Sequence, residues 1–87
     1  MTIEKICKEK TRLEETLKKE HEMLFCVARG IRADMLKAHY LHNYKEENCY
    51  SRSFQAIYNM IQDMGLAEEY DIFEGNLEEF MEQAYNR

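Results

Sequence analysis

The sequence predicts an all-α fold, a small bundle of three to four helices whose first helix is long, amphipathic and coiled-coil-like. Two observations support this prediction. The 87 residues include no proline and only three glycines, so few positions interrupt a helix. Apolar residues near the N-terminus also recur at alternating steps of three and four, which is the heptad spacing of a coiled coil.

The first predicted helix covers about residues 2–28, with Thr2 as its candidate N-cap. Its regularly spaced positions, which we call the heptad seam, are Ile3, Ile6, Lys10, Leu13, Leu17, Glu20, Leu24, Val27 and Ile31. We expect a break or sharp kink near Arg29-Gly30, because a glycine inside a helix costs about 1 kcal/mol relative to alanine. The heptad phase continues to Leu41, so an unbroken helix over 2–45 is the alternative.

A second helix is predicted over about 31–45, with apolar residues on two sides. Its first face holds Ile31, Met35, Ala38 and His42, and the nearly opposite face holds Leu36, Tyr40 and Tyr44. A helix of this kind lies in the centre of a bundle, or between a core and a partner. The stretch "KEENCYS" is the expected turn after it.

Two further helices are predicted at about 52–64 and 76–86. Ser51 or Ser53 would cap the first of them, Gly65 would end it, and Leu66 would pack back over its last turn. We expect a single helical turn in "LAEEYDIF". Asn76 precedes Glu79 by three residues, which is the capping-box spacing at the start of the last helix.

Residues 1–87 are expected to form one domain whose helices differ in length. The first helix is about twice as long as any other, so its early seam would remain uncovered in a monomer. We therefore predict a homodimer or higher oligomer formed through Ile3, Ile6, Leu13 and Leu17. A monomer with a frayed N-terminus is the alternative.

The charge is divided unequally along the chain. Residues 1–45 carry ten Lys/Arg against seven Asp/Glu, whereas residues 46–87 carry two against ten. Either the two halves attract each other within one bundle, or the acidic half faces a basic partner.

The sequence predicts a cytoplasmic protein. No apolar run approaches the ~18 residues that a membrane-spanning helix needs, and the charged N-terminus lacks the apolar stretch of a signal peptide. Cys7, Cys26 and Cys49 form an odd, widely spaced set, which fits reduced thiols better than a disulfide framework.

The stretch "HYLHNYKEENCYS" is the strongest candidate for a chemical site. His39 and His42 are three residues apart, and Glu46 or Cys49 could add a third zinc ligand. The spacing H-x2-H-x6-C matches no strong zinc pattern, however, and a packed histidine is the preferred interpretation. Cys49 could lie near a helix N-terminus, but the neighbouring glutamates would disfavour its thiolate form and weaken it as a nucleophile.

The sequence contains no motif that indicates an enzyme. It lacks a P-loop, G-x-G-x-x-G and G-x-S-x-G, and no small-molecule substrate is evident. Its adjacent glutamate pairs diverge by about 100° on a helix and do not converge on one site. We therefore predict a non-catalytic protein without a cofactor or metal.

Direct nucleic-acid binding is also disfavoured. The stretch "AIYNMIQDMGLAEEYDIF" could form a helix-turn-helix, but its recognition segment carries three acids and no Lys or Arg, so phosphates would repel it. Arg29, Arg32 and Lys37 form the only modestly basic set. A small DNA- or zinc-binding module remains an alternative that would use these residues, or His39, His42 and Cys49.

The preferred functional prediction is a small regulatory or inhibitory protein that binds itself and another protein. The predicted partner-binding residues combine aromatic and acidic side chains: Tyr40, Tyr44, Glu68, Glu69, Tyr70, Asp71, Phe73 and Glu74. The alternative within this class is an acidic mimic of nucleic acid that blocks a nucleic-acid-binding protein. Its profile is similar to that of small acidic inhibitors carried by phages and mobile elements, without a motif that ties it to one family.

Overall fold

The computed structural model describes residues 3–85, with side chains from Arg12 to Tyr85, and confirms the all-α fold. Within this range the chain forms four helices in the order α1 (Ile3–Tyr40), α2 (Tyr44–Asp63), α3 (Ala67–Glu74) and α4 (Leu77–Tyr85). The long first helix is therefore confirmed, and it is followed by three shorter ones.

Helix α1 is 38 residues long and continues through Gly30. The predicted break at Arg29-Gly30 is wrong, and so is the division into helices 2–28 and 31–45. Buried residues lie on both sides of the glycine, with Phe25 and Ala28 before it and Leu36 after it. Their packing fixes the helix on both sides and outweighs the cost of about 1 kcal/mol for one glycine.

The turn between α1 and α2 lies at residues 41–43, so the predicted turn at "KEENCYS" is also wrong. His42 adopts a left-handed backbone (φ 60°), and the Asn43 N–H donates to the Ala38 carbonyl at 2.9 Å. The Asn43 side chain then accepts from the Glu46 N–H at 3.3 Å and caps α2. Asparagine is a strong N-cap, and Glu46 and Glu47 in the first turn favour the helix start, so "KEENCYS" is helical.

The end of α2 follows the sequence prediction. Gly65 has φ 74°, its N–H donates to the Gln62 carbonyl, and the Leu66 N–H donates to the Ile61 carbonyl, both at 2.9 Å. This pair of bonds is a Schellman motif, in which a left-handed glycine ends the helix. Leu66 packs back against the core, as predicted, and the chain reverses into α3.

Helices α3 and α4 are short and separated by Gly75. The stretch "LAEEYDIF" forms more than the single turn expected, since α3 has eight residues. Gly75 ends it with φ 59°. Helix α4 begins at Leu77, one residue after the predicted start, and the Phe80 N–H donates to the Asn76 carbonyl at 2.9 Å.

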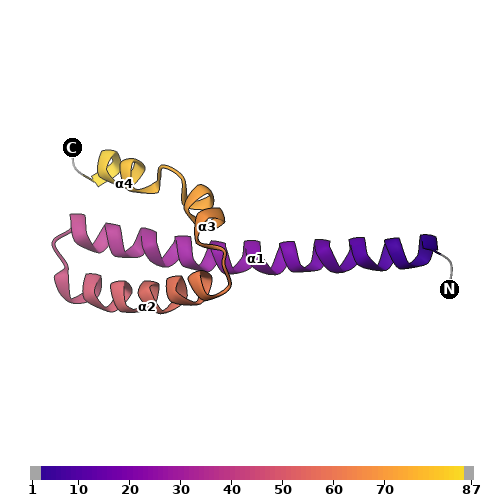
Figure 1. Ribbon diagram of the computed structural model, residues 1–87. Helices are drawn as coiled ribbons and strands as arrows, with labels where there is room; N and C mark the ends of the chain where they lie inside the picture. Colours follow the sequence, from indigo (N-terminus) through magenta and orange to yellow (C-terminus); the bar gives the residue numbers. More distant parts are fainter. Residues whose placement is uncertain (1–2, 86–87) are drawn as a thin grey trace.

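The shorter helices cover only the C-terminal half of α1 (Figure 1). Helix α2 runs back along one side of α1, α3 and α4 lie on the other side, and the N-terminal half of α1 projects alone. The molecule measures 61 × 24 × 16 Å and has a radius of gyration of 17.4 Å. A compact chain of this length would have a radius of about 12 Å, so the projecting helix dominates the shape.

Two hydrophobic clusters hold the bundle together. The first is centred on Phe25, Ala28, Ile61 and Tyr70 from α1, α2 and α3. The second joins α1 to α4 and is formed by Leu36, Leu77 and Met81, with Ala33 and Tyr40 packed against it. Helix α1 is therefore apolar on two sides because it is the central helix, as the pattern of residues 31–40 predicted.

Candidate protein-binding surfaces

The heptad seam of α1 is covered by α2 only in its C-terminal part. Leu24 packs against the first cluster, which includes Ile61 of α2. Farther toward the N-terminus, Leu17 is 52% exposed and Leu13 is 65% exposed. The cause is helix length, because α2 has 20 residues and spans about 30 Å, whereas α1 has 38 and spans about 57 Å.

Two residues of the predicted self-association surface, Ile3 and Ile6, lie outside the described side chains. Their backbone belongs to α1, so their seam positions follow from the helical repeat. Val27 extends the exposed seam in the opposite direction, and Met23 is exposed beside it. Between Leu13 and Val27 the apolar seam residues are therefore exposed except for Leu24, which packs against the first cluster.

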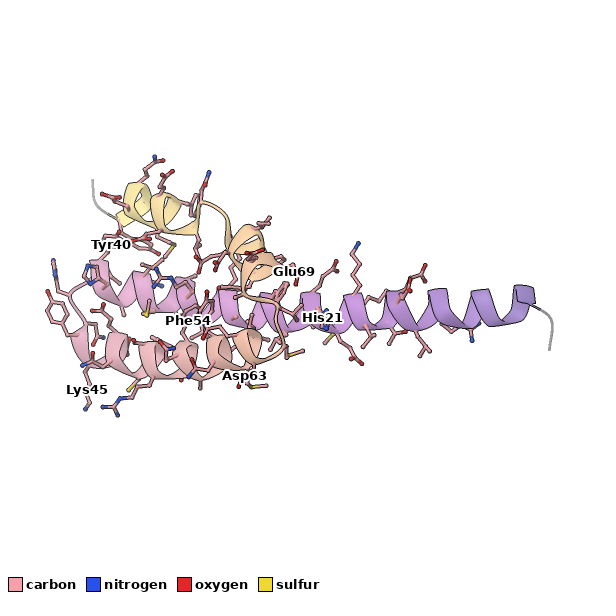
Figure 2. All side chains as sticks on the ribbon, in the orientation of Figure 1. His21, Tyr40, Lys45, Phe54, Asp63 and Glu69 are labelled. Carbon is pink, nitrogen blue, oxygen red and sulfur yellow. The ribbon has the colours of Figure 1, made fainter. Side chains whose placement is uncertain are left out.

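A groove of about 350 Å³ lies between α1 and α3, at the point where α1 begins to project. Its lining combines two aromatic rings and an isoleucine with charged or ionisable side chains: Lys18, His21, Glu22, Phe25, Glu69, Ile72 and Phe73. Figure 2 shows His21 and Glu69 on its α1 and α3 sides. Phe25 and Phe73 form the packed part, with ring centroids 5.6 Å apart, whereas Ile72 is 81% exposed.

Tyr70 holds α3 in place and so builds this groove. Its side chain is 1% exposed, with its ring edge-on to Phe25 and to Tyr58 at centroid distances of 5.7 and 5.8 Å. Its hydroxyl donates to Glu74 at 3.0 Å. Burial, followed by the Glu74 charge and this hydrogen bond, raises the pKa of Tyr70 well above 10.0. The predicted role of Tyr70 in partner binding is therefore wrong, because the ring is part of the core.

Acidic side chains of α3 interact with residues of α1 and α2 in the same chain. Tyr58 donates to Asp71 at 3.2 Å, and Arg32 Nε lies 3.4 Å from a Glu74 carboxylate oxygen. Arg32 also reaches Glu78 at 3.7 Å. These contacts support the first interpretation of the charge division, in which the basic and acidic halves attract each other. Of the predicted acidic residues, Glu68, Glu69 and Asp71 are exposed and Glu74 is half-buried.

Tyr40 and Tyr44 do not share a helix face. Tyr40 ends α1 and packs against the second cluster, at the place labelled in Figure 2. Tyr44 begins α2, is exposed, and its hydroxyl lies 3.0 Å from Nδ1 of His42. The predicted common face is wrong because the chain turns between the two tyrosines. His42 is exposed in this turn, and its predicted place in the stripe with Ile31, Met35 and Ala38 is wrong for the same reason.

The candidate zinc residues are dispersed. His39 Nδ1 lies 3.0 Å from a Glu47 oxygen, His42 contacts Tyr44, and Cys49 is exposed on α2. Among the side chains described, from Arg12 to Tyr85, no group of three or more His, Cys, Asp or Glu residues is placed to hold a metal ion. Of the candidate basic set, Arg29 donates to the Glu74 carbonyl at 3.4 Å and Arg32 pairs with acids, whereas Lys37 is exposed.

The described helices also include none that is both long and apolar enough to cross a membrane. Comparison of the sequence with protein-family models and with curated proteins, and of the structure with solved structures, finds no significant match.

The sequence prediction missed Ile72, together with the groove beside it. The sequence predicts both Tyr70 and Phe73 as partner anchors, but on a helix Ile72 lies about 200° from Tyr70. Once Tyr70 is assigned to the core, helical geometry alone places Ile72 on the outer side of α3. The signal was present in "EEYDIFE", provided that the segment is read as a two-turn helix.

Proposed function

We propose that this chain is a non-catalytic regulatory or inhibitory protein that acts as a homodimer by binding another protein. The observation that carries the proposal is the set of large apolar side chains left exposed on an otherwise packed bundle. Leu13 and Leu17 on α1, and Ile72 on α3, are all more than half exposed. Contiguous exposed apolar surface with a polar rim is typical of protein interaction sites.

Self-association uses the heptad seam of α1. Leu13 and Leu17 lie on the helix face that, about two to three turns farther along, packs against the first cluster through Leu24. A second amphipathic helix would cover them in the same manner, and a second copy of α1 supplies such a helix. Cytoplasmic location is part of the proposal, because the widely spaced cysteines fit a reducing compartment.

Partner binding uses the groove between α1 and α3. Its apolar part, formed by Phe25, Phe73 and Ile72, suits an apolar anchor side chain of a partner helix. Lys18 and Glu69 lie at the groove and carry opposite charges, so they could orient the partner through complementary polar contacts. The groove and the exposed seam belong to different faces of α1, which allows both to be occupied at once.

The experiment is affinity capture from a lysate of the source organism with three forms of the full-length chain. Ile72→Glu places a charge in the groove, and Phe80→Glu, which alters an exposed apolar residue on α4, is the matched control. The proposal expects a protein that wild type and Phe80→Glu capture and Ile72→Glu does not. The proposal would be contradicted if all three forms capture the same protein equally. It would also be contradicted if the wild-type chain captures no protein in a saturable manner.

A further inference from the structure

The heptad seam contains two charged positions, and they are of opposite sign. Lys10 and Glu20 occupy seam positions ten residues apart, and both belong to the continuous helix α1. Leu13 and Leu17 lie between them and are exposed. A charged residue at a single seam position commonly sets the register and orientation of a coiled coil, at a cost in stability. The spacing of these two charges therefore constrains the orientation and register of the helix that pairs with the seam.

We propose that two copies of α1 pair antiparallel, with a two-fold axis beside residue 15, so that Lys10 of each copy faces Glu20 of the other. This inference rests on the proposed self-association and adds its orientation and register. In this register Leu13 faces Leu17 of the second copy. The outer seam positions match as well, with Ile6 opposite Leu24 and Ile3 opposite Val27. Each apolar position thus meets an apolar one, and each charge meets its opposite.

The competing arrangements match less well. A parallel, in-register pair would place Lys10 against Lys10 and Glu20 against Glu20, and like charges across a helix interface destabilise it. An antiparallel pair shifted by one heptad toward the N-terminus would place Lys10 opposite Leu13 and Glu20 opposite Ile3. Both charges would then lose their partners at an apolar interface, which is costly.

The described surface of α1 is compatible with this register. The paired segment covers residues 3–27, about 37 Å of helix. Leu13, Leu17 and Val27 are more than half exposed, whereas Leu24 is half-buried against the first cluster, so the second copy would reach Leu24 only from its exposed side. Phe25 and Lys18 lie roughly 80–100° around the helix from Leu17. The second copy therefore leaves the groove between α1 and α3 accessible, and the dimer presents two such grooves.

The test is charge reversal, read as the dimer dissociation constant by sedimentation equilibrium of the full-length chain. Lys10→Glu and Glu20→Lys are measured separately and together. Lys8→Glu and Glu15→Lys make the same charge changes at heptad positions that face away from the seam, and serve as matched controls. Circular dichroism of each variant establishes that it remains helical.

The antiparallel register expects each single seam variant to weaken the dimer by about tenfold or more, because the symmetric dimer holds two copies of the pair. The double variant restores the dissociation constant to near the wild-type value, and the controls leave it unchanged. Single variants without effect, or a double variant that stays as weak as the singles, would overturn the register while leaving self-association intact. A monomeric wild type at micromolar concentration would overturn self-association itself.

Discussion

Arg32 and Glu74 form an ion pair that links the basic and acidic halves of the chain. The Arg32 Nε atom lies 3.4 Å from a carboxylate oxygen of Glu74, and the guanidinium lies 5.7 Å from the ring centroid of Phe54. One side chain of α1 thus contacts both α2 and α3. The ion pair accounts for part of the unequal charge, because Glu74 and Glu78 of the acidic half both interact with Arg32 of the basic half.

We expect Arg32→Met to lower the free energy of unfolding by about 1–2 kcal/mol, since it leaves the half-buried Glu74 carboxylate without its cationic partner. Both side chains are about one-fifth exposed, at 22% and 21%, so solvent only partly screens the pair. A double-mutant cycle with Glu74→Gln should give a coupling energy of about 0.5–1 kcal/mol by urea denaturation. Lys37→Met, at an exposed site of the same helix, is the control; a coupling energy of zero would show that the contact contributes nothing.

Gly30→Ala should stabilise the protein by about 0.5–1 kcal/mol, because Gly30 is exposed in the middle of a continuous helix. A Cβ added there meets nothing within 4 Å, so the added methyl group causes no clash. Thermal and urea denaturation measure the change. Destabilisation by this substitution would indicate that α1 bends at Gly30 after all.

Asn43→Ala should destabilise the protein by about 1 kcal/mol, because the Asn43 side chain caps α2 by accepting from the Glu46 N–H. Asn48→Ala is the matched control, since Asn48 is an exposed residue inside the same helix. Urea denaturation gives the free energy of unfolding of both variants and so distinguishes the loss of the N-cap from the loss of an asparagine inside the helix. Equal effects would place the start of α2 elsewhere.

Stability should fall as the pH rises above about 10, and Tyr70 should account for part of that fall. Burial and Glu74 raise the pKa of Tyr70, so the folded chain keeps this phenol protonated after the unfolded chain has released its proton. The stabilisation is complete below the ordinary value of 10.0 and is lost as the pH increases toward the higher folded value. Tyr58 acts in the same direction, because burial and Asp71 raise its pKa too.

Tyr70→Phe tests this assignment. It removes the hydrogen bond to Glu74, which should cost about 1 kcal/mol at neutral pH, and it should flatten the alkaline decline. The measurement is the free energy of unfolding between about pH 8 and 11. Tyr44→Phe, which removes an exposed phenol, is the control. An alkaline slope identical in wild type and Tyr70→Phe would contradict the assignment.

The helical fold was predictable because its determinants are local and periodic. The heptad spacing from Ile3 to Ile31 predicted a long first helix, and the Gly65-Leu66 signal predicted the end of α2; both features are confirmed. The break at Gly30 was predicted wrongly because the intrinsic cost of one glycine is small, and packing on both sides of it decides. The turn at residues 41–43 was missed because Leu41 and His42 carry no turn signal, and only Asn43 marks the start of α2.

The interaction surfaces were predictable only in part. The uncovered seam followed from helix lengths, which the sequence indicates through its few breaks. The sequence does not determine which face of α3 is buried, because "YDIF" contains three aromatic or aliphatic residues that could each enter the core. The tertiary contact with Phe25 places Tyr70 there. Arg32 and Glu74 are far apart in sequence, so their pairing required the fold.

Sedimentation equilibrium of wild type and Leu13→Ser/Leu17→Ser tests the central claim, that the exposed seam of α1 joins two copies of the chain. Both leucines are solvent-exposed, so the substitutions leave the core intact, and Met60→Ser/Phe80→Ser removes a comparable exposed pair on other helices. At micromolar concentration we expect wild type and the control at twice the 10.5 kDa chain mass, and the seam variant at the mass of one chain. A monomeric wild type, or a seam variant that remains dimeric, would contradict the claim.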